Sequence, residues 1–333
     1  MIRFIIGPLP AWAERENPLL NYQLKQTETP SRGSRLLRAL LIVLLLAGLG
    51  VGGWAVATNV FAQPAGQHAT DIAISVLFYP MLVVQIGLSL AALALTIGTV
   101  SEERGHLTWE NLRATPSGAA LTLRTRWASV FYRLRAALGL VVLIRLLLIG
   151  GMLLDLTAFQ GRYLDLLISG VEPSLPTMLG PVPFAVPLAA LLLALFLTAT
   201  LLLPFTDVAF NAALGILLST LISRRIYSVV LQFLLFIVRV AVVAALVWLV
   251  MGFIEGRSPF PLEDWQAWLS VFGFSAFADW GLMLLHLGFS GEVWTLIPYG
   301  LFIGPMLVVY MLLQAALANF LLRWAVRLGQ RRG

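Results

Sequence analysis

Long runs of apolar residues recur along the sequence, and they restrict the possible fold more than any other feature. The clearest runs are 39–57, 72–100, 136–154 and 226–254. About 18 or more apolar residues in a row can cross the roughly 30 Å hydrocarbon core of a bilayer as a helix. Charged residues make up only 11% of the 333 residues, whereas a soluble domain carries about 25%. The sequence therefore predicts an all-α, polytopic integral membrane protein.

Two further apolar regions leave the number of crossings open. Residues 182–222 would form a helix of about 62 Å, twice the hydrocarbon thickness, so they are either two spans or one helix kinked near Pro204. Residues 269–289 are long enough to cross but contain Asp279. Six spans, the last being 293–322, put 18 of the 22 basic residues on one side of the membrane. The positive-inside rule favours this topology, with both termini cytoplasmic.

This topology assigns a place to each segment outside the spans, within a single transmembrane domain 1–333. Residues 1–38 are expected to form a cytoplasmic amphipathic segment that includes a helix on the membrane surface. Residues 101–135 become a cytoplasmic segment between the second and third spans. Residues 255–292 become an outer, re-entrant region between the fifth and sixth spans, and they include tryptophans of the kind found at headgroup level.

Several classes of site are excluded by residues that the chain lacks. It has no cysteine, and its three histidines lie far apart in sequence, so no metal site or cysteine nucleophile is predicted. The single lysine, Lys25, does not follow a glycine-rich turn, as a nucleotide-binding P-loop requires. We therefore expect no catalytic, cofactor or metal site in this chain, and an intramembrane enzyme is the least favoured class. The positive net charge is explained by topology rather than by nucleic acid.

Three charged residues fall inside predicted spans: Arg145, Asp207 and Arg239. Charged groups at this depth are costly, and they usually face the interior of the bundle and pair with one another. We expect Asp207 to neutralise either Arg145 or Arg239. The pairing would serve either as an internal strut that fixes helix register or as a substrate contact.

The most informative stretch outside the spans is 101–117. Its spacing predicts a short amphipathic helix that leaves the second span, and Thr115-Pro116 reads as the start of a new helix leading into the third. A helix of this kind at the cytoplasmic surface can dock into a groove on a soluble partner. The residues that would carry this contact are Glu102, Glu103, Arg104, Gly105, Leu107, Trp109, Glu110, Leu112, Thr115 and Pro116.

This stretch resembles the cytoplasmic coupling region of ABC exporter membrane subunits of the ABC-two type. The matching residues are Glu103-Arg104-Gly105, Leu107, Trp109-Glu110, Leu112 and Thr115-Pro116, and His106 stands where threonine is usual. Two shorter patches are also similar to the family. They are the N-P-L-L and L-K-Q groups within 17–26, before the first span, and the glycine- and serine-containing run 214–219 in the fourth.

The resemblance implies a permease that exports a substrate across the cytoplasmic (inner) membrane of a prokaryote. Such subunits pair with a second copy or a sibling permease, and each sits on a separate ATP-binding-cassette ATPase subunit. ATP and Mg would bind the partner, and the 101–116 segment would receive the mechanical input. Membrane lipids are the other expected partners. The sequence does not indicate the substrate.

A second reading remains open, in which the chain is a non-transporting scaffold subunit of a larger membrane complex. On that reading 101–135 is an ordinary basic loop that the positive-inside rule holds in the cytoplasm. Glu103-Arg104-Gly105 and Thr115-Pro116 favour coupling, because the loop rule does not explain them. The two readings differ in whether an ATPase docks at 101–116.

Overall fold

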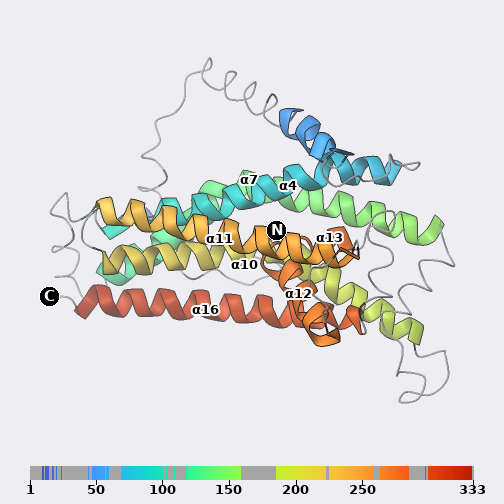
Figure 1. The fold of residues 1–333 in the computed structure, drawn as a ribbon. Coiled ribbons are helices and arrows are strands. Elements are labelled where there is room, and N and C mark those ends of the chain that lie inside the picture. Colours follow the sequence, from blue (N-terminus) through green and yellow to red (C-terminus); the bar gives the residue numbers. More distant parts are fainter. Residues whose placement is uncertain are drawn as a thin grey trace.

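The computed structural model is entirely helical in its regular elements over the part of the chain that it describes (Figure 1). Five of its helices are long and apolar enough to cross a membrane. The length and apolar composition of these helices indicate an integral membrane protein. The described residues are 10, 12–14, 17, 18, 20, 24, 44, 47–56, 58, 59, 69–100, 103, 109, 118–158, 185–222, 225–254, 256, 257, 263–284, 297 and 299–331.

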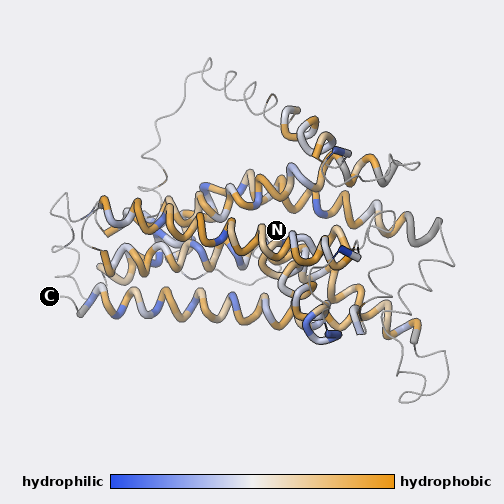
Figure 2. Tube along the Cα trace, in the orientation of Figure 1, coloured by the Kyte–Doolittle hydropathy of each residue, from blue (hydrophilic) through white to orange (hydrophobic). Residues whose placement is uncertain are grey.

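The described part of the chain has five long helices, and three short elements lie between the fourth and fifth of them. The long helices are α4 (Ala69–Ile97), α7 (Gly118–Ala158), α10 (Ala185–Leu221), α11 (Arg225–Ile254) and α16 (Ile303–Arg331). The short elements are α12 (Asp264–Ala276), α13 (Gly281–Leu284) and the 3-10 turn η2 (Gly300–Phe302). Apolar residues dominate the middle of the long helices (Figure 2).

These bounds answer one of the questions that the sequence left open. The run 182–222 contains a single helix, α10, with Pro204 inside it, rather than two spans. The region 269–289 is not one crossing helix in its described part, because α12 ends at Ala276 and α13 follows after a turn. Of the predicted first span 39–57, the structure describes chiefly a ten-residue apolar helix, Ala47–Val56.

Two helices reach further than the spans predicted for them. α7 begins at Gly118 and runs without a break through 136–154, so the end of the segment 101–135 is continuous with the third span. α16 continues to Arg331, nine residues beyond the predicted span 293–322. Both extensions carry arginines, which fits a helix that projects from the hydrocarbon core into water.

α10 occupies the centre of the bundle. It packs most extensively against α16, and also against α4 and α7, whereas α11 lies at the edge against α12 and α4. Glycines make these approaches close. A Cβ atom at Gly304 would lie 2.6 Å from the Leu192 carbonyl oxygen, and one at Gly215 would lie 3.0 Å from that of Leu93. Small residues at helix interfaces are the usual way in which membrane helices approach closely.

One end of the bundle gathers most of the arginines of the described helices, though not Arg145 or Arg239. α4, α10 and α16 end there and α7 and α11 begin there, at the left of Figure 1. We call it the basic end; its arginines include Arg124, Arg126, Arg323, Arg327 and Arg331. A few described residues before the first span also pack near this end, since the Tyr132 hydroxyl donates to the Ala13 carbonyl at 2.9 Å and Leu20 is buried.

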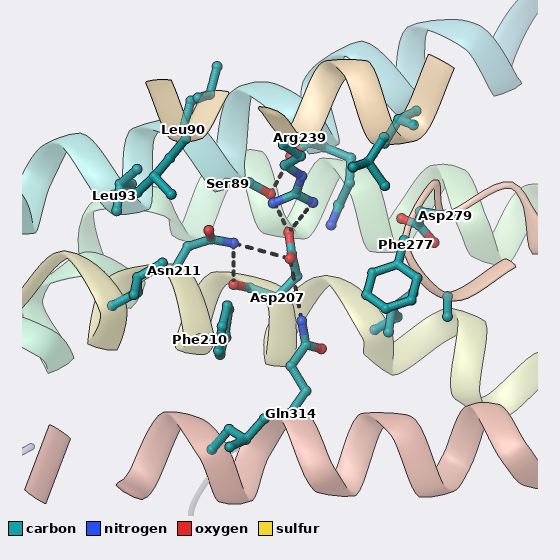
Figure 3. Close-up of a pocket in the computed structure, with 18 of the residues that line it drawn as sticks. Ser89, Leu90, Leu93, Asp207, Phe210, Asn211, Arg239, Phe277, Asp279 and Gln314 are labelled. Carbon is teal, nitrogen blue, oxygen red and sulfur yellow. Dashed lines mark hydrogen bonds and ion pairs between the residues drawn. The ribbon is translucent and has the colours of Figure 1, made fainter. Parts of the chain in front are cut away.

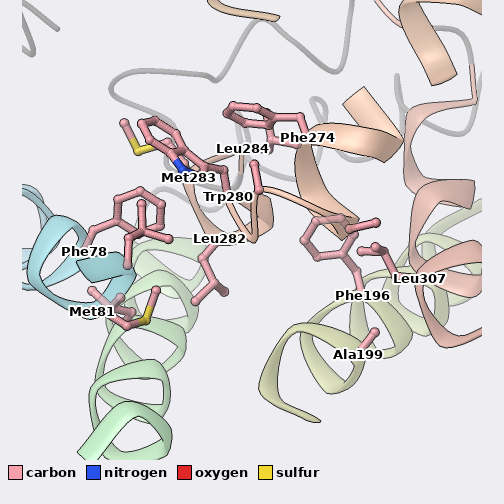
Figure 4. Close-up of a cluster of buried hydrophobic side chains, with 14 of the residues drawn as sticks. Phe78, Met81, Phe196, Ala199, Phe274, Trp280, Leu282, Met283, Leu284 and Leu307 are labelled. Carbon is pink, nitrogen blue, oxygen red and sulfur yellow. The ribbon is translucent and has the colours of Figure 1, made fainter. Parts of the chain in front are cut away.

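Toward the opposite end, the turn between α12 and α13 inserts apolar side chains between the long helices (Figure 4). The Trp280 ring lies 5.6 Å from the Phe78 ring and 5.3 Å from the Phe274 ring, centroid to centroid. Leu282 and Met283 are fully enclosed in the same cluster. The apolar side chains of this turn therefore close this end of the bundle. The same packing fixes the position of Asp279, the residue just before Trp280.

Candidate functional site

Asp207 lies within α10, and side chains from four helices converge on its carboxylate (Figure 3). Asn211 of α10 donates to Oδ1 at 3.1 Å and Gln314 of α16 at 3.4 Å. Oδ2 accepts from Ser89 of α4 and from Arg239 of α11, the latter at 3.0 Å. We call these five residues the Asp207 cluster. It ties α4, α10, α11 and α16 together near the middle of the bundle.

The cluster is oriented by further hydrogen bonds. Thr206 Oγ1 donates to Gln314 Oε1 at 2.7 Å, which leaves the Gln314 amide nitrogen directed at Asp207. Asn211 is fixed in a similar way, because its amide also donates to the Asp207 carbonyl oxygen at 2.8 Å. The carboxylate of Asp207 is thus fully used as an acceptor, as a buried charge needs to be.

Arg145 of α7 is fully buried and forms a second ion pair. Its Nη2 donates to Asp279, in the turn that follows α12, and its Nη1 donates to the Thr200 carbonyl of α10. The second bond has a cause in the sequence. Pro204 has no backbone N–H, so the Thr200 carbonyl four residues earlier has no donor within the helix. Arg145 supplies that donor, as neighbouring helices commonly do for proline in membranes.

Asp279 is held in an unusual backbone conformation. Its φ of 62° lies in the left-handed region, which aspartate tolerates better than most residues. The conformation turns the chain so that the Asp279 carboxylate contacts Arg145, while the Trp280 ring packs against Phe78 and Phe274. Burial raises the pKa of the Asp279 carboxyl above its usual range, and the Arg145 guanidinium opposes this rise.

A cavity of about 560 Å³ lies beside the Asp207 cluster and extends to Asp279. Its walls are mainly leucine, valine and phenylalanine side chains, with a few polar groups, which is the usual composition of a small-molecule site. Four apolar side chains that line it are also exposed, on α11, after α12 and on α16: Val242, Phe277, Leu313 and Leu317. The cavity therefore opens sideways between α11 and α16, where the surface faces lipid.

The segment that carries the family resemblance is described at two of its ten residues, Glu103 and Trp109. Trp109 is 3% exposed. It belongs to a cluster of buried side chains at the basic end, which we call the Trp109 cluster, and a Cβ atom on Gly329 would lie 3.6 Å from its ring. The other members are Val100, Ala119, Leu123, Ala213, Ile216, Leu217, Ala318, Leu322, Ala325 and Val326.

Eight predicted coupling residues lie outside the described part of the chain. They are Glu102, Arg104, Gly105, Leu107, Glu110, Leu112, Thr115 and Pro116. The patch 214–219, by contrast, is described, and it packs on the end of α4. Ser219 Oγ accepts from the Val100 N–H at 2.7 Å, and Gly215 gives room for Thr96.

The three charges that the sequence placed inside spans are brought into one region but not into one pair. Of the two partners expected for Asp207, the structure selects Arg239, and Arg145 pairs with Asp279 instead. The sequence had no strong signal for Ser89 or Gln314, since polar side chains of this kind are common in spans. Among the described residues, no group of His, Cys, Asp and Glu side chains is arranged to hold a metal ion.

Comparison of the chain with protein-family models, with curated proteins and with solved structures finds no match.

Proposed function

We propose that the chain is the membrane-spanning permease subunit of an ABC exporter, powered by ATP hydrolysis on a separate ATPase subunit. In this proposal the basic end faces the cytoplasm, as the positive-inside rule requires of its arginines. The membrane is the inner membrane of a prokaryote, a second permease copy or sibling completes the transporter, and α12 and α13 belong to a re-entrant outer region.

The observation that carries the proposal is the burial of Trp109 among the ends of the long helices. A loop that merely stays in the cytoplasm has no need of a fully enclosed tryptophan. Because the Trp109 cluster contains residues of α7, α10 and α16, a displacement of the 101–116 segment would be felt by all three helices. This is the mechanical property that a coupling segment needs.

α10 and α16 connect this input to the cavity. Ala213 of α10 belongs to the Trp109 cluster, and Asp207, less than two helical turns before it, is the centre of the Asp207 cluster. α16 contacts the same two clusters, the Asp207 cluster through Gln314 and the Trp109 cluster through Ala318. Coupling between two sites requires an element with two arrangements that both sites bias. The pair α10–α16 is our candidate for that element.

The test is reconstitution of the full chain in liposomes with the ATPase encoded nearest to it in the genome. We expect the permease to stimulate ATP hydrolysis, and we expect Glu103→Ala and Gly105→Pro to abolish most of that stimulation. Arg323→Gln is the matched control, because Arg323 is an exposed residue at the same end outside the segment. It should retain stimulation.

Two results would contradict the proposal. If no ATPase binds or responds to the chain, the scaffold reading is favoured. If Glu103→Ala and Arg323→Gln reduce stimulation equally, the 101–116 segment has no special role in coupling. Retention of both variants in the membrane at wild-type levels shows that either result concerns coupling rather than folding.

A further inference from the structure

The cavity beside the Asp207 cluster is bordered by two charged groups whose hydrogen-bonding capacity is only partly used. Asp279 accepts from Arg145 through Oδ2, and within the described residues its Oδ1 accepts no hydrogen bond. Arg239 donates to Asp207 through Nη2, and the described residues offer no acceptor to its Nε or Nη1. Both residues line the cavity. One anionic acceptor and one cationic donor therefore remain available to a ligand.

A third polar group adds to the acceptor side. Gln85 of α4 lines the same cavity, and its Oε1 atom is buried without a hydrogen-bond partner among the described residues. A buried acceptor that is left unpaired is destabilising, so a ligand N–H that reached it would be stabilised. Asp207, by contrast, has no capacity to spare, because four donors already occupy it.

The charges around the cavity balance one another. The carboxylates of Asp207 and Asp279 are matched by the guanidinium groups of Arg239 and Arg145. A ligand with a single net charge would enter this low-dielectric site without a counter-ion, which is unfavourable. A ligand that carries both signs of charge keeps the balance and can use the Asp279 oxygen and the Arg239 N–H groups together.

The shape of the cavity indicates where the ligand comes from. Its exposed apolar rim, formed by Val242, Phe277, Leu313 and Leu317, opens between α11 and α16. Arg239 lies near the middle of α11, so this opening is at the depth of the acyl chains rather than of bulk water. The molecule that enters must have an apolar part that can stay in the bilayer while its polar part reaches the charged groups.

From these observations we infer that the cavity binds the headgroup of a zwitterionic phospholipid. Its ammonium group would contact Asp279 Oδ1 and Gln85 Oε1, its phosphate would accept from Arg239, and its acyl chains would leave between α11 and α16. Binding does not depend on transport. Only the further step, that this lipid is the exported cargo, rests on the proposed function.

The experiment compares three lipids that share dioleoyl chains and differ in headgroup charge. Phosphatidylethanolamine carries both charges, phosphatidylglycerol only the phosphate, and dioleoyl-aminopropane, whose primary ammonium keeps its N–H donors, only the cation. Each is titrated into the purified full chain in detergent, and the dissociation constant is measured by native mass spectrometry. We expect phosphatidylethanolamine to bind about tenfold more tightly than either of the others, as the loss of one charge-assisted hydrogen bond would predict.

Two kinds of variant locate the binding. Asp279→Asn should bring phosphatidylethanolamine down to the affinity of phosphatidylglycerol, a change in selectivity that a purely structural role would not produce. Leu313→Trp should narrow the opening and weaken phosphatidylethanolamine binding about tenfold. Its matched control is Leu312→Trp, because Leu312 is 60% exposed beside Leu313, which is 57% exposed, but does not line the cavity. The Leu312 variant should bind as the wild type does.

The inference is overturned if either singly charged lipid binds as tightly as phosphatidylethanolamine. It is also overturned if Leu312→Trp and Leu313→Trp have equal effects, since the lipid would then lie on the outer surface of the bundle. The proposed function fails separately. If lipid selectivity is absent but ATPase stimulation is intact, only the inferred lipid ligand is refuted. If lipid binding is selective but no ATPase responds, only the proposed transport function is refuted.

Discussion

α10 and α11 are neighbours in the chain and are both long, apolar helices, yet they hold opposite places in the bundle. In the most apolar part of α10, 39% of the residues are buried in the protein, against 6% in the corresponding part of α11. α10 is therefore surrounded by other helices, and α11 presents most of its surface to lipid. The overall apolar character of a helix does not decide between these two places.

Small and polar residues account for the difference. α10 carries Ala212, Ala213 and Gly215 at positions where α4 and α16 approach, and all three lie in the same short stretch, 207–215, as Asp207. α11 presents large apolar side chains on nearly every side, such as Phe233 at 65% exposure and Trp248 at 64%. Its ties to the bundle are the Arg239–Asp207 ion pair and its packing against α12 and α4. In lipid, close packing and polar contacts hold helices together, and apolar surface alone does not.

The largest effect should come from the buried arginine of α7 that donates to α10. Arg145→Met removes the only hydrogen-bond donor of Asp279 among the described residues and leaves the Thr200 carbonyl unpaired. Breaking a buried ion pair from one side costs about 3–5 kcal/mol. We expect the free energy of unfolding to fall by about that amount, as measured in detergent by the fluorescence of the tryptophans during denaturant titration.

The matched variant on α11 is Arg239→Met, and it should cost clearly less. The Arg239 side chain is 32% exposed, and Asp207 would keep Ser89, Asn211 and Gln314 as donors after the substitution. Equal losses for the two arginine variants would show that α11 is held as firmly as α10, and the contrast between the helices would then be wrong.

The second effect concerns the close contact of α10 with α16. In Gly304→Ala the new Cβ atom would come within 2.6 Å of the Leu192 carbonyl oxygen, so the two helices would have to separate. Overpacking of this kind typically costs about 1–3 kcal/mol. Gly150→Ala on α7 is the control, because nothing lies within 4 Å of its Cβ position. Unfolding measurements should show a loss for the first variant and none for the second.

The comparison also shows what the sequence could predict. The helices themselves were predictable from their apolar runs, since a span must satisfy all its backbone hydrogen bonds within itself. α11, predicted as 226–254, starts one residue earlier, at Arg225. The length of the run 182–222 left either one or two spans possible, because Pro204 can either kink or end a helix, and only the positive-inside rule favoured the single helix that α10 forms. The Thr200 carbonyl, which lacks a helical donor because of Pro204, accepts from Arg145, 55 residues away in the sequence.

The candidate site could be predicted only in part, and the reason is physical. Two arginines and one aspartate inside the spans leave one positive charge without a partner, so charge balance alone called for a second buried acid. Asp279 was visible in an apolar stretch, but its depth depends on the left-handed turn and the Trp280 plug, which are tertiary features. Trp109 was predicted as a coupling residue, and its burial between helix ends has no signature in local sequence.

The smallest effect should come from the outer surface of α11, where a change tests whether lipid really faces it. Phe233→Ala removes a side chain that is 65% exposed, and its environment in the bilayer changes little when the helices separate. The expected loss is below about 0.5 kcal/mol, in line with other surface substitutions. Phe205→Ala is the control on α10, since Phe205 is also exposed, at 39%, and should cost equally little.

A marked difference between these two phenylalanines would be the most informative outcome, because it would alter the meaning of the contrast between α10 and α11. If Phe233→Ala costs more than about 1 kcal/mol while Phe205→Ala does not, then another protein surface covers α11 in the assembled protein. The second permease copy of the proposed transporter would be the first candidate for that surface. The loss should then depend on protein concentration, because an interface between copies is stabilised by mass action. A loss that is independent of concentration would instead place the missing contact within the chain.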